Sequence, residues 1–194
     1  MIIDMAHLDS KKQTILAGAP NGRRAMGALL AKTTQEPLGP EPLYLDFASV
    51  QVATASFLRE GVLRFRDAVR SQHSNFYPVV ANANEQIIEE LSLLAHASND
   101  VLMTCSLSEQ GEPMKTGLIG ELDPKQKLTF DLVNSLGEAN ASELMQNQDS
   151  NENAKQNAWN NRLAGLANLG LVFEISQGRA KRYKRLFEEE SYGA

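Results

Sequence analysis

The sequence has a single cysteine, Cys105, and lacks any long apolar run. One cysteine excludes an intramolecular disulfide and a zinc site built from several thiolates. No window approaches the roughly 18 apolar residues of a membrane-spanning helix, and the opening "MIIDMAHLDSKKQ" lacks the basic and apolar regions of a secretion signal. We therefore expect a cytoplasmic protein that neither spans a membrane nor is exported.

Catalytic and cofactor-binding patterns are missing as well. His7, His73 and His96 are scattered along the chain without the spacing of metal ligands. The glycines of "AGAPNGRR" match neither the phosphate-binding loop nor the dinucleotide fingerprint. Cys105 follows an apolar run, which favours a small core residue over a nucleophile. We expect no enzyme activity, no cofactor and no bound metal.

What the sequence does contain is an uneven distribution of charge. Residues 154–186 carry seven Lys or Arg against Glu174 alone, a net charge of +6, so the remainder of a chain that totals −5 carries −11. A positive patch attracts polyanions to one face of the molecule, and the acidic remainder repels them from the other faces. A basic segment that is merely solvated is the alternative interpretation.

Up to about residue 120, short apolar runs alternate with helical patterns. The spacing of apolar residues predicts helices over 21–34, 54–72 and 84–98. Extended runs predict strands over 13–17, 42–50 and 76–82, and a final hairpin formed by 100–107 and 114–120. Strands that alternate with helices predict the α/β class, a sheet covered by helices.

After residue 120 the pattern changes to short helices and a basic hairpin. Helices are predicted over 123–136, 140–148 and 151–170, with Asp123 and Asn140 as N-caps and Gly170 just past the last end. Two extended runs, 171–176 and 182–186, flank a turn at Gly178. The chain, of which 42% is hydrophobic, is long enough for two small domains. We predict these at 1–120 and 121–194.

The stretch "AWNNRLAGLANLGLV", followed by "GRAKRY", resembles the recognition helix and wing of the winged helix-turn-helix DNA-binding domains of bacterial transcription regulators. The resemblance covers about residues 120–187, and the order of three helices and a hairpin agrees with it. It implies duplex DNA as the partner, bound by a homodimer that reads two half-sites. Winged helices also serve as protein-binding modules, so the fold leaves the function open.

An earlier stretch, "YLDFASVQVATASFLREGVLRF", resembles the STAS-like modules found beside bacterial histidine-kinase-like ATPases, and "NGRRAMGALL" is similar to the helix that precedes it there. This resemblance covers about residues 14–106. It implies a kinase-like ATPase as partner and a phosphate-accepting serine at the turn that Thr54 and Ser56 occupy. The turn lacks an Asp-Ser-Ser-Gly stretch, and Thr54 as an ordinary helix N-cap is the favoured interpretation. Asp46 is either a turn former or a polar contact at the same edge.

The predicted third helix of the second domain has one polar face. At 100° per residue, Trp159 and two leucines fall on one side, which makes Trp159 a core residue. The other side carries Asn157 and Asn161, flanked by Asn160. Asparagine is a poor helix former, whereas its carboxamide can pair with the N6 and N7 edge of adenine. We predict that these three asparagines read bases.

Neighbouring residues are expected to hold the DNA backbone. Lys155 and Gln156 lie in the first turn, at the positive end of the helix dipole. Arg162 lies at the edge of the apolar side, where it covers the domain or reaches the backbone. The remaining predicted contacts are those of the wing, Arg179, Lys181 and Arg182.

Together these patterns predict a DNA-binding transcriptional regulator whose first domain senses a signal or binds a partner. The alternative is a protein-interaction adaptor, in which the winged helix docks an acidic partner and the STAS-like domain works with a kinase-like ATPase as an anti-sigma-antagonist-like switch.

Overall fold

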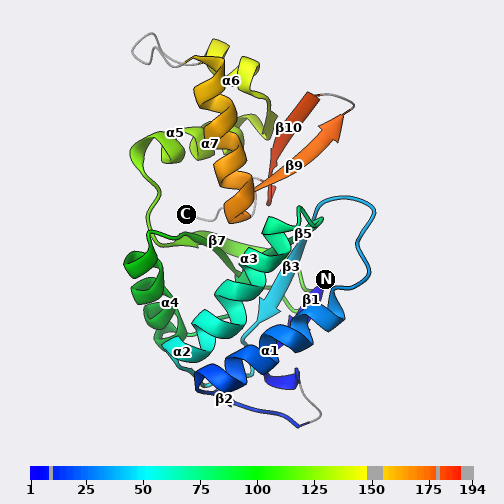
Figure 1. Cartoon of the computed structure of the whole chain (residues 1–194), viewed down its shortest axis with the longest axis vertical. Coiled ribbons are helices and arrows are strands. Elements are labelled where there is room, and N and C mark those ends of the chain that lie inside the picture. Colours follow the sequence, from blue (N-terminus) through cyan, green and yellow to red (C-terminus); the bar gives the residue numbers. More distant parts are fainter. Residues whose placement is uncertain (9–10, 148–154, 178–179, 189–194) are drawn as a thin grey trace.

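The computed structural model describes residues 1–8, 11–147, 155–177 and 180–188, and its centre is a five-stranded sheet (Figure 1). The first four strands of the sheet order β1-β3-β5-β6-β7 are parallel, and β7 is antiparallel to β6. The strands are β1 Ile2–Asp4, β3 Glu41–Asp46, β5 Phe76–Ala81, β6 Leu102–Leu107 and β7 Pro113–Ile119. The α/β class predicted from the alternation of strands and helices is confirmed, and so is the final hairpin.

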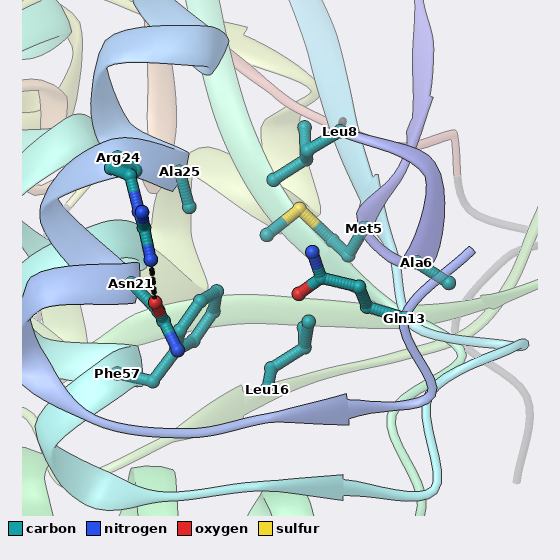
Figure 2. Close-up of a pocket in the computed structure, with 9 residues that line it drawn as sticks. All are labelled: Met5, Ala6, Leu8, Gln13, Leu16, Asn21, Arg24, Ala25 and Phe57. Carbon is teal, nitrogen blue, oxygen red and sulfur yellow. Dashed lines mark hydrogen bonds between the residues drawn. The ribbon is translucent and has the colours of Figure 1, made fainter. Parts of the chain in front are cut away.

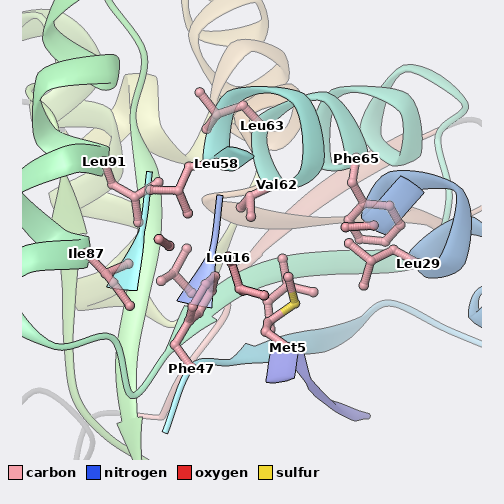
Figure 3. Close-up of a cluster of buried hydrophobic side chains, with 14 of the residues drawn as sticks. Met5, Leu16, Leu29, Phe47, Leu58, Val62, Leu63, Phe65, Ile87 and Leu91 are labelled. Atoms are coloured by element: carbon pink, nitrogen blue, oxygen red, sulfur yellow. The ribbon is translucent and has the colours of Figure 1, made fainter. Parts of the chain in front are cut away.

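Helices connect the parallel strands and cover one face of the sheet. They are α1 Ala19–Lys32, the consecutive segments α2 Ala55–Leu58, η2 Arg59–Leu63 and α3 Arg64–Ser71, and α4 Glu85–Ser98. In Figure 3, Leu58 of α2 lies beside Leu91 of α4, and Phe65 of α3 lies beside Leu29 of α1. All four side chains belong to one buried apolar cluster, which forms the core between helices and sheet. A short parallel pair, β2 Ile15–Leu16 and β4 Val52–Ala53, lies at its edge.

A close crossing of α1 over η2 depends on two glycines. A Cβ atom at Gly22 would lie 2.7 Å from the carbonyl oxygen of Phe57, and one at Gly61 would lie 3.2 Å from the oxygen of Gly22. The first distance is too short for any side chain, so only glycine allows the two backbones to approach. Glu60, beside this crossing, is buried and lies within 3.7 Å of Arg23, 3.3 Å of Arg59 and 2.8 Å of Arg64.

The second half of the chain forms helices and a small sheet. The helices are α5 Pro124–Leu136, α6 Ala141–Asn147 and α7 Gln156–Leu169, and the antiparallel sheet β8-β10-β9 contains β8 Glu138–Ala139, β9 Val172–Gln177 and β10 Ala180–Arg185. Asp123 Oδ1 accepts hydrogen bonds from the backbone of Lys125 and Gln126, which confirms it as an N-cap. Asn140 caps α6 in the same way, and Gly170 ends α7 with a φ of 79°.

The second apolar cluster contains side chains from both halves of the chain. Tyr77 and Met103 of the main sheet share it with Trp159 of α7 and Phe173 of β9. These residues lie on opposite sides of the predicted boundary between 1–120 and 121–194. The division into two domains therefore stays a prediction, because the apolar contacts continue across it.

The junction between the two halves is polar as well as apolar. The Tyr77 hydroxyl accepts a hydrogen bond from the backbone N–H of Glu174 at 2.8 Å, and the Tyr77 ring meets Phe173 edge-on with centroids 4.9 Å apart. The guanidinium of Arg70 lies 3.7 Å above the Tyr77 ring, and its Nε donates to the carbonyl oxygen of Ala167 at 3.1 Å. These contacts join α3 and β5 to the end of α7 and to β9.

Among the described residues, no helix combines the length and the apolar character needed to cross a membrane.

The glycine crossing yields a prediction with an internal control. Gly22→Ala places a methyl group against backbone, so we expect it to lower the free energy of unfolding by about 2 kcal/mol. Gly27 lies on the same helix with nothing within 4 Å of its Cβ position, so Gly27→Ala should raise that free energy by about 0.5 kcal/mol or more through helix propensity. Urea unfolding of both variants measures the difference. Equal changes in the free energy of unfolding for the two variants would contradict a close backbone contact at Gly22.

Candidate nucleic-acid interface

Helix α7 is positioned by an apolar side that is fully enclosed. Trp159, Leu163 and Leu166 have no exposed surface and pack in the second apolar cluster with Phe130 and Val133 of α5. The prediction that Trp159 is a core residue is confirmed. Because these side chains determine the rotation of α7 about its axis, they also determine which residues point outward.

The outward side of α7 carries the predicted asparagines. Asn157, Asn160 and Asn161 are all exposed. Asn160 and Asn161 line an open groove between α7, the start of α6 and strand β10, to which β10 contributes Lys181 and Tyr183. Amide groups and a lysine amine dominate this groove, and both kinds of group can form hydrogen bonds with base edges or phosphates.

Gln156 has a positioning role in the first turn of α7. Its Nε2 donates a hydrogen bond to Ser142 Oγ of α6 at 2.7 Å. Both residues line the groove, so this bond links α6 to α7 there. Lys155 occupies the N-cap position of α7 and is exposed, which is compatible with the predicted contact with phosphate.

Strands β9 and β10 form an antiparallel hairpin at the position of the predicted wing. Gly178 and Arg179, predicted as turn residue and backbone contact, lie outside the described residues. Lys181 Nζ lies 2.8 Å from Glu174 Oε1 across the hairpin, yet about half of the lysine side chain stays exposed to solvent. It faces the same groove as the asparagines, which fits a contact with phosphate.

Arg182 differs from the expectation that it is available to phosphate. Its guanidinium forms a fork with Glu143 of α6, with distances of 2.9 and 3.2 Å to the two carboxylate oxygens, and it also bonds to Glu138 of β8. Glu143 in turn accepts a hydrogen bond from the backbone N–H of Asn140. The hydrogen bonds from Arg182 hold the pKa of Glu143 below its ordinary value. Arg182 therefore ties β10 to β8 and α6.

Other basic residues of the segment are also engaged inside the molecule. Glu188 lies 3.5 Å from Lys184 Nζ and 3.0 Å from Arg185 Nη2. The guanidinium of Arg162 lies over the Trp159 ring, 4.8 Å from its centroid. Of the two predicted arrangements, covering the domain or reaching the DNA backbone, this is the first. The sequence segment offers Glu174 as its only acid, but folding adds Glu138, Glu143 and Glu188. The positive patch is correspondingly smaller than the linear count indicates.

The turn of the first half contains a helix cap. Thr54 Oγ1 accepts hydrogen bonds from the backbone N–H of Phe57 at 3.4 Å and of Gly18 at 3.1 Å, which confirms Thr54 as the N-cap of α2. The Ser56 hydroxyl lies 3.2 Å from the same oxygen and is half-buried. Asp46 Oδ1 accepts from Ala48 N–H and from the side chain of Asn82, so it is both turn former and polar contact.

A small pocket lies near this turn, under α1 (Figure 2). Arg24 bonds to Asn21 at its wall, and Gln13, Met5 and Phe57 point into it. Its volume of about 30 Å³ matches the space of a single water molecule. We assign no ligand to it.

Titratable groups elsewhere bear on two other kinds of site, a metal site and a reactive thiol. No group of three or more His, Cys, Asp or Glu that could hold a metal occurs within residues 1–8, 11–147, 155–177 and 180–188. Cys105 is buried, and burial, followed by the charge of Asp46, raises the pKa of its thiol to about 12. A thiol in that state is not a nucleophile at neutral pH.

Comparison of the chain with protein-family models, with curated proteins and with solved structures gave no match. The family resemblances of the sequence therefore stay predictions.

The contact between Arg182 and Glu143 yields a pH prediction. A carboxyl group with a lowered folded pKa stabilises the fold above its unfolded value, near 4.5, and that contribution is lost as the pH falls through the folded pKa. Glu143→Gln keeps the capping geometry and removes the charge. We expect it to lower the thermal midpoint by about 2 °C at neutral pH and to have almost no effect near pH 3.

The control for that measurement is Glu89→Gln, which removes the same charge from an exposed position on α4. Midpoints of all three proteins across the acidic range test the idea. A Glu143→Gln deficit that persists unchanged to the lowest pH would contradict an electrostatic role.

Proposed function

We propose that the chain is a DNA-binding transcriptional regulator, in which residues 121–194 act as a winged helix-turn-helix and α7 is the recognition helix. The observation that carries the proposal is the groove that joins the exposed Asn160 and Asn161 of α7 to Lys181 of the hairpin. The order α5-β8-α6-α7-β9-β10, with the sheet β8-β10-β9, supports the same assignment.

The placement of α7 supports contact with a long duplex. In Figure 1 the Gln156 end of α7 lies far from the main sheet, whereas the Leu169 end lies beside α3. The exposed asparagines belong to the first two turns, at the distant end. A duplex can therefore approach this end of the helix from the side opposite to the main sheet.

The proposed mechanism is non-covalent recognition. Carboxamides of Asn157, Asn160 and Asn161 pair with base edges, where each good bidentate pair contributes about 1 to 3 kcal/mol of discrimination. Lys155, Lys181 and the first N–H groups of α7 hold phosphate oxygens. Arg182 contributes by holding α6 against the hairpin, and Arg179 stays a predicted phosphate contact.

The first half of the chain is proposed to be a STAS-like unit that receives a signal or binds a partner such as a kinase-like ATPase. The turn at Thr54 and Ser56 is its predicted partner or phosphate-accepting site. The contacts of Arg70 and Tyr77 with α7 and β9 supply a physical route from this half to the recognition helix. A homodimer that reads two half-sites fits the same proposal.

One observation favours the adaptor alternative. Lys181, Arg182, Lys184 and Arg185 each lie within ion-pair distance of a glutamate of the same chain. A duplex, which takes most of its affinity from cations, has to compete with these carboxylates for them. In the adaptor alternative the groove between α6, α7 and β10 docks an acidic protein partner.

Replacing single asparagines separates base reading from surface solvation. With a preferred site selected from a random duplex pool, Asn160→Ala and Asn161→Ala should each lower affinity for that site by about 1 to 3 kcal/mol and change binding to random duplex little. Asn168→Ala is the matched control, because Asn168 is exposed on the same helix but outside the groove. Equal losses for all three variants would contradict base reading by the groove.

Substituting a residue that contacts the DNA backbone should have a different effect on binding. Lys181→Gln should weaken binding to all duplexes similarly. It should also reduce the slope of log affinity against log salt concentration by about one unit, the value for one lost phosphate contact. The same titration with several salt concentrations measures both properties. If neither the whole chain nor its variants enrich any sequence, the adaptor alternative replaces this proposal.

A further inference from the structure

Arg70, in the last turn of α3, is a buried cation with a fixed orientation. Only 4% of its surface is exposed. Besides its bond to Ala167, Nη1 donates to the carbonyl oxygens of Ser74 at 2.6 Å and of Phe76 at 3.2 Å. With the Tyr77 ring on one side, these bonds leave the guanidinium no freedom to rotate toward solvent.

The charge of Arg70 lacks a counter-ion within the described ranges. No carboxylate oxygen there lies within 4.0 Å of its guanidinium. Nearby carboxylates have other partners: Glu174 pairs with Lys181 at 2.8 Å, and Glu36 accepts from the backbone of Asn75 at 2.8 Å. Asp67, on the same helix, pairs with Arg66. Burial lowers the pKa of Arg70, and Tyr77 and the charges of Glu174 and Glu36 offset this effect in part.

An open cleft lies beside this cation. Arg70 lines a space of about 420 Å³ between the segment after α1, the start of β5 and strand β9. That volume is in the range of small-molecule sites. Leu38, which is fully exposed, and Ile175 give the cleft apolar walls, whereas His73 and Ser176 are exposed polar residues on it.

We propose that this junction cleft binds a small organic monocarboxylate, whose carboxylate pairs with Arg70 and whose apolar part contacts Leu38 and Ile175. Because Nε and Nη1 of Arg70 already donate to backbone carbonyl oxygens, the ligand carboxylate accepts its hydrogen bond from Nη2. Glu174 also lines the cleft, and its negative charge repels a ligand with two negative charges more strongly than a ligand with one. The ligand chemistry is therefore one anionic group on an apolar body.

If the proposed function is correct, a ligand in this cleft would regulate DNA binding. The same guanidinium that meets the ligand holds the carbonyl of Ala167 in the last turn of α7. A carboxylate that shares the Arg70 donors acts directly on the anchor of the recognition helix. Binding of a small monocarboxylate in the cleft would in this way signal to the recognition helix.

Thermal unfolding of the whole chain with butyrate tests the site. Butyrate at about ten times its Kd should raise the midpoint by about 3 °C relative to sodium chloride of equal ionic strength. Butyramide, which has the same shape without the charge, should give no shift, and inorganic phosphate should give less than butyrate. No shift with butyrate, an equal shift with butyramide, or a larger one with phosphate overturns the proposal.

Two substitutions at one position show whether the binding occurs in this cleft. His73 lines it and has a φ of 53°, a conformation that Asn and Asp tolerate. His73→Asp adds a carboxylate beside Arg70 and should abolish the butyrate shift, whereas His73→Asn should keep it. A shift that survives in His73→Asp places butyrate elsewhere and overturns the site. Since no DNA is present, failure here leaves the proposed function untouched, and failure of duplex enrichment leaves a butyrate shift standing.

Discussion

The contact of Arg70 with the last turn of α7 is the constraint on which the arrangement of the two halves depends. It joins a helix of the main sheet to the helix that carries the exposed asparagines, and Tyr77 adds a hydrogen bond to β9. Removing the guanidinium would leave three backbone carbonyl oxygens without this donor in a buried place. Arg70 thus fixes the end of α7 against the main sheet, together with Tyr77 and the apolar cluster that both halves share.

Charge in this protein has to be judged in three dimensions. The basic segment contains one acid in sequence, but the fold brings glutamates from β8, α6 and the segment after β10 to its arginines and lysines. Arg182 is the clearest case, because its two partners, Glu138 and Glu143, lie 44 and 39 positions away. Lys155 and about half of the Lys181 side chain stay exposed beside the amide face of α7. In the proposed function, selectivity at this groove would depend more on hydrogen-bond geometry than on overall electrostatic attraction.

The sequence predicted the elements that carry local signals. Caps at Asp123 and Asn140 and the glycine after α7 mark helix ends through short-range bonds, and the apolar side of α7 identified both Trp159 and the outward asparagines. Strands β1 and β8 were not predicted, because three and two residues show no periodicity. The junction cleft could not be predicted either. Leu38, Arg70 and Glu174 come from distant parts of the chain, and only tertiary packing places them together.

The groove lies at the end of α7 that is remote from the Arg70 contact. The 14 residues of α7 span about 20 Å, so a rotation of the second half about a pivot near Gly170, with α7 packed inside it, moves the Gln156 tip furthest. A tilt of about 5° at the pivot displaces the tip by about 2 Å, which is more than a hydrogen bond to a base edge tolerates. Movements at the junction too small to alter its packing are thereby amplified into the presence or absence of contact at the far end of the helix.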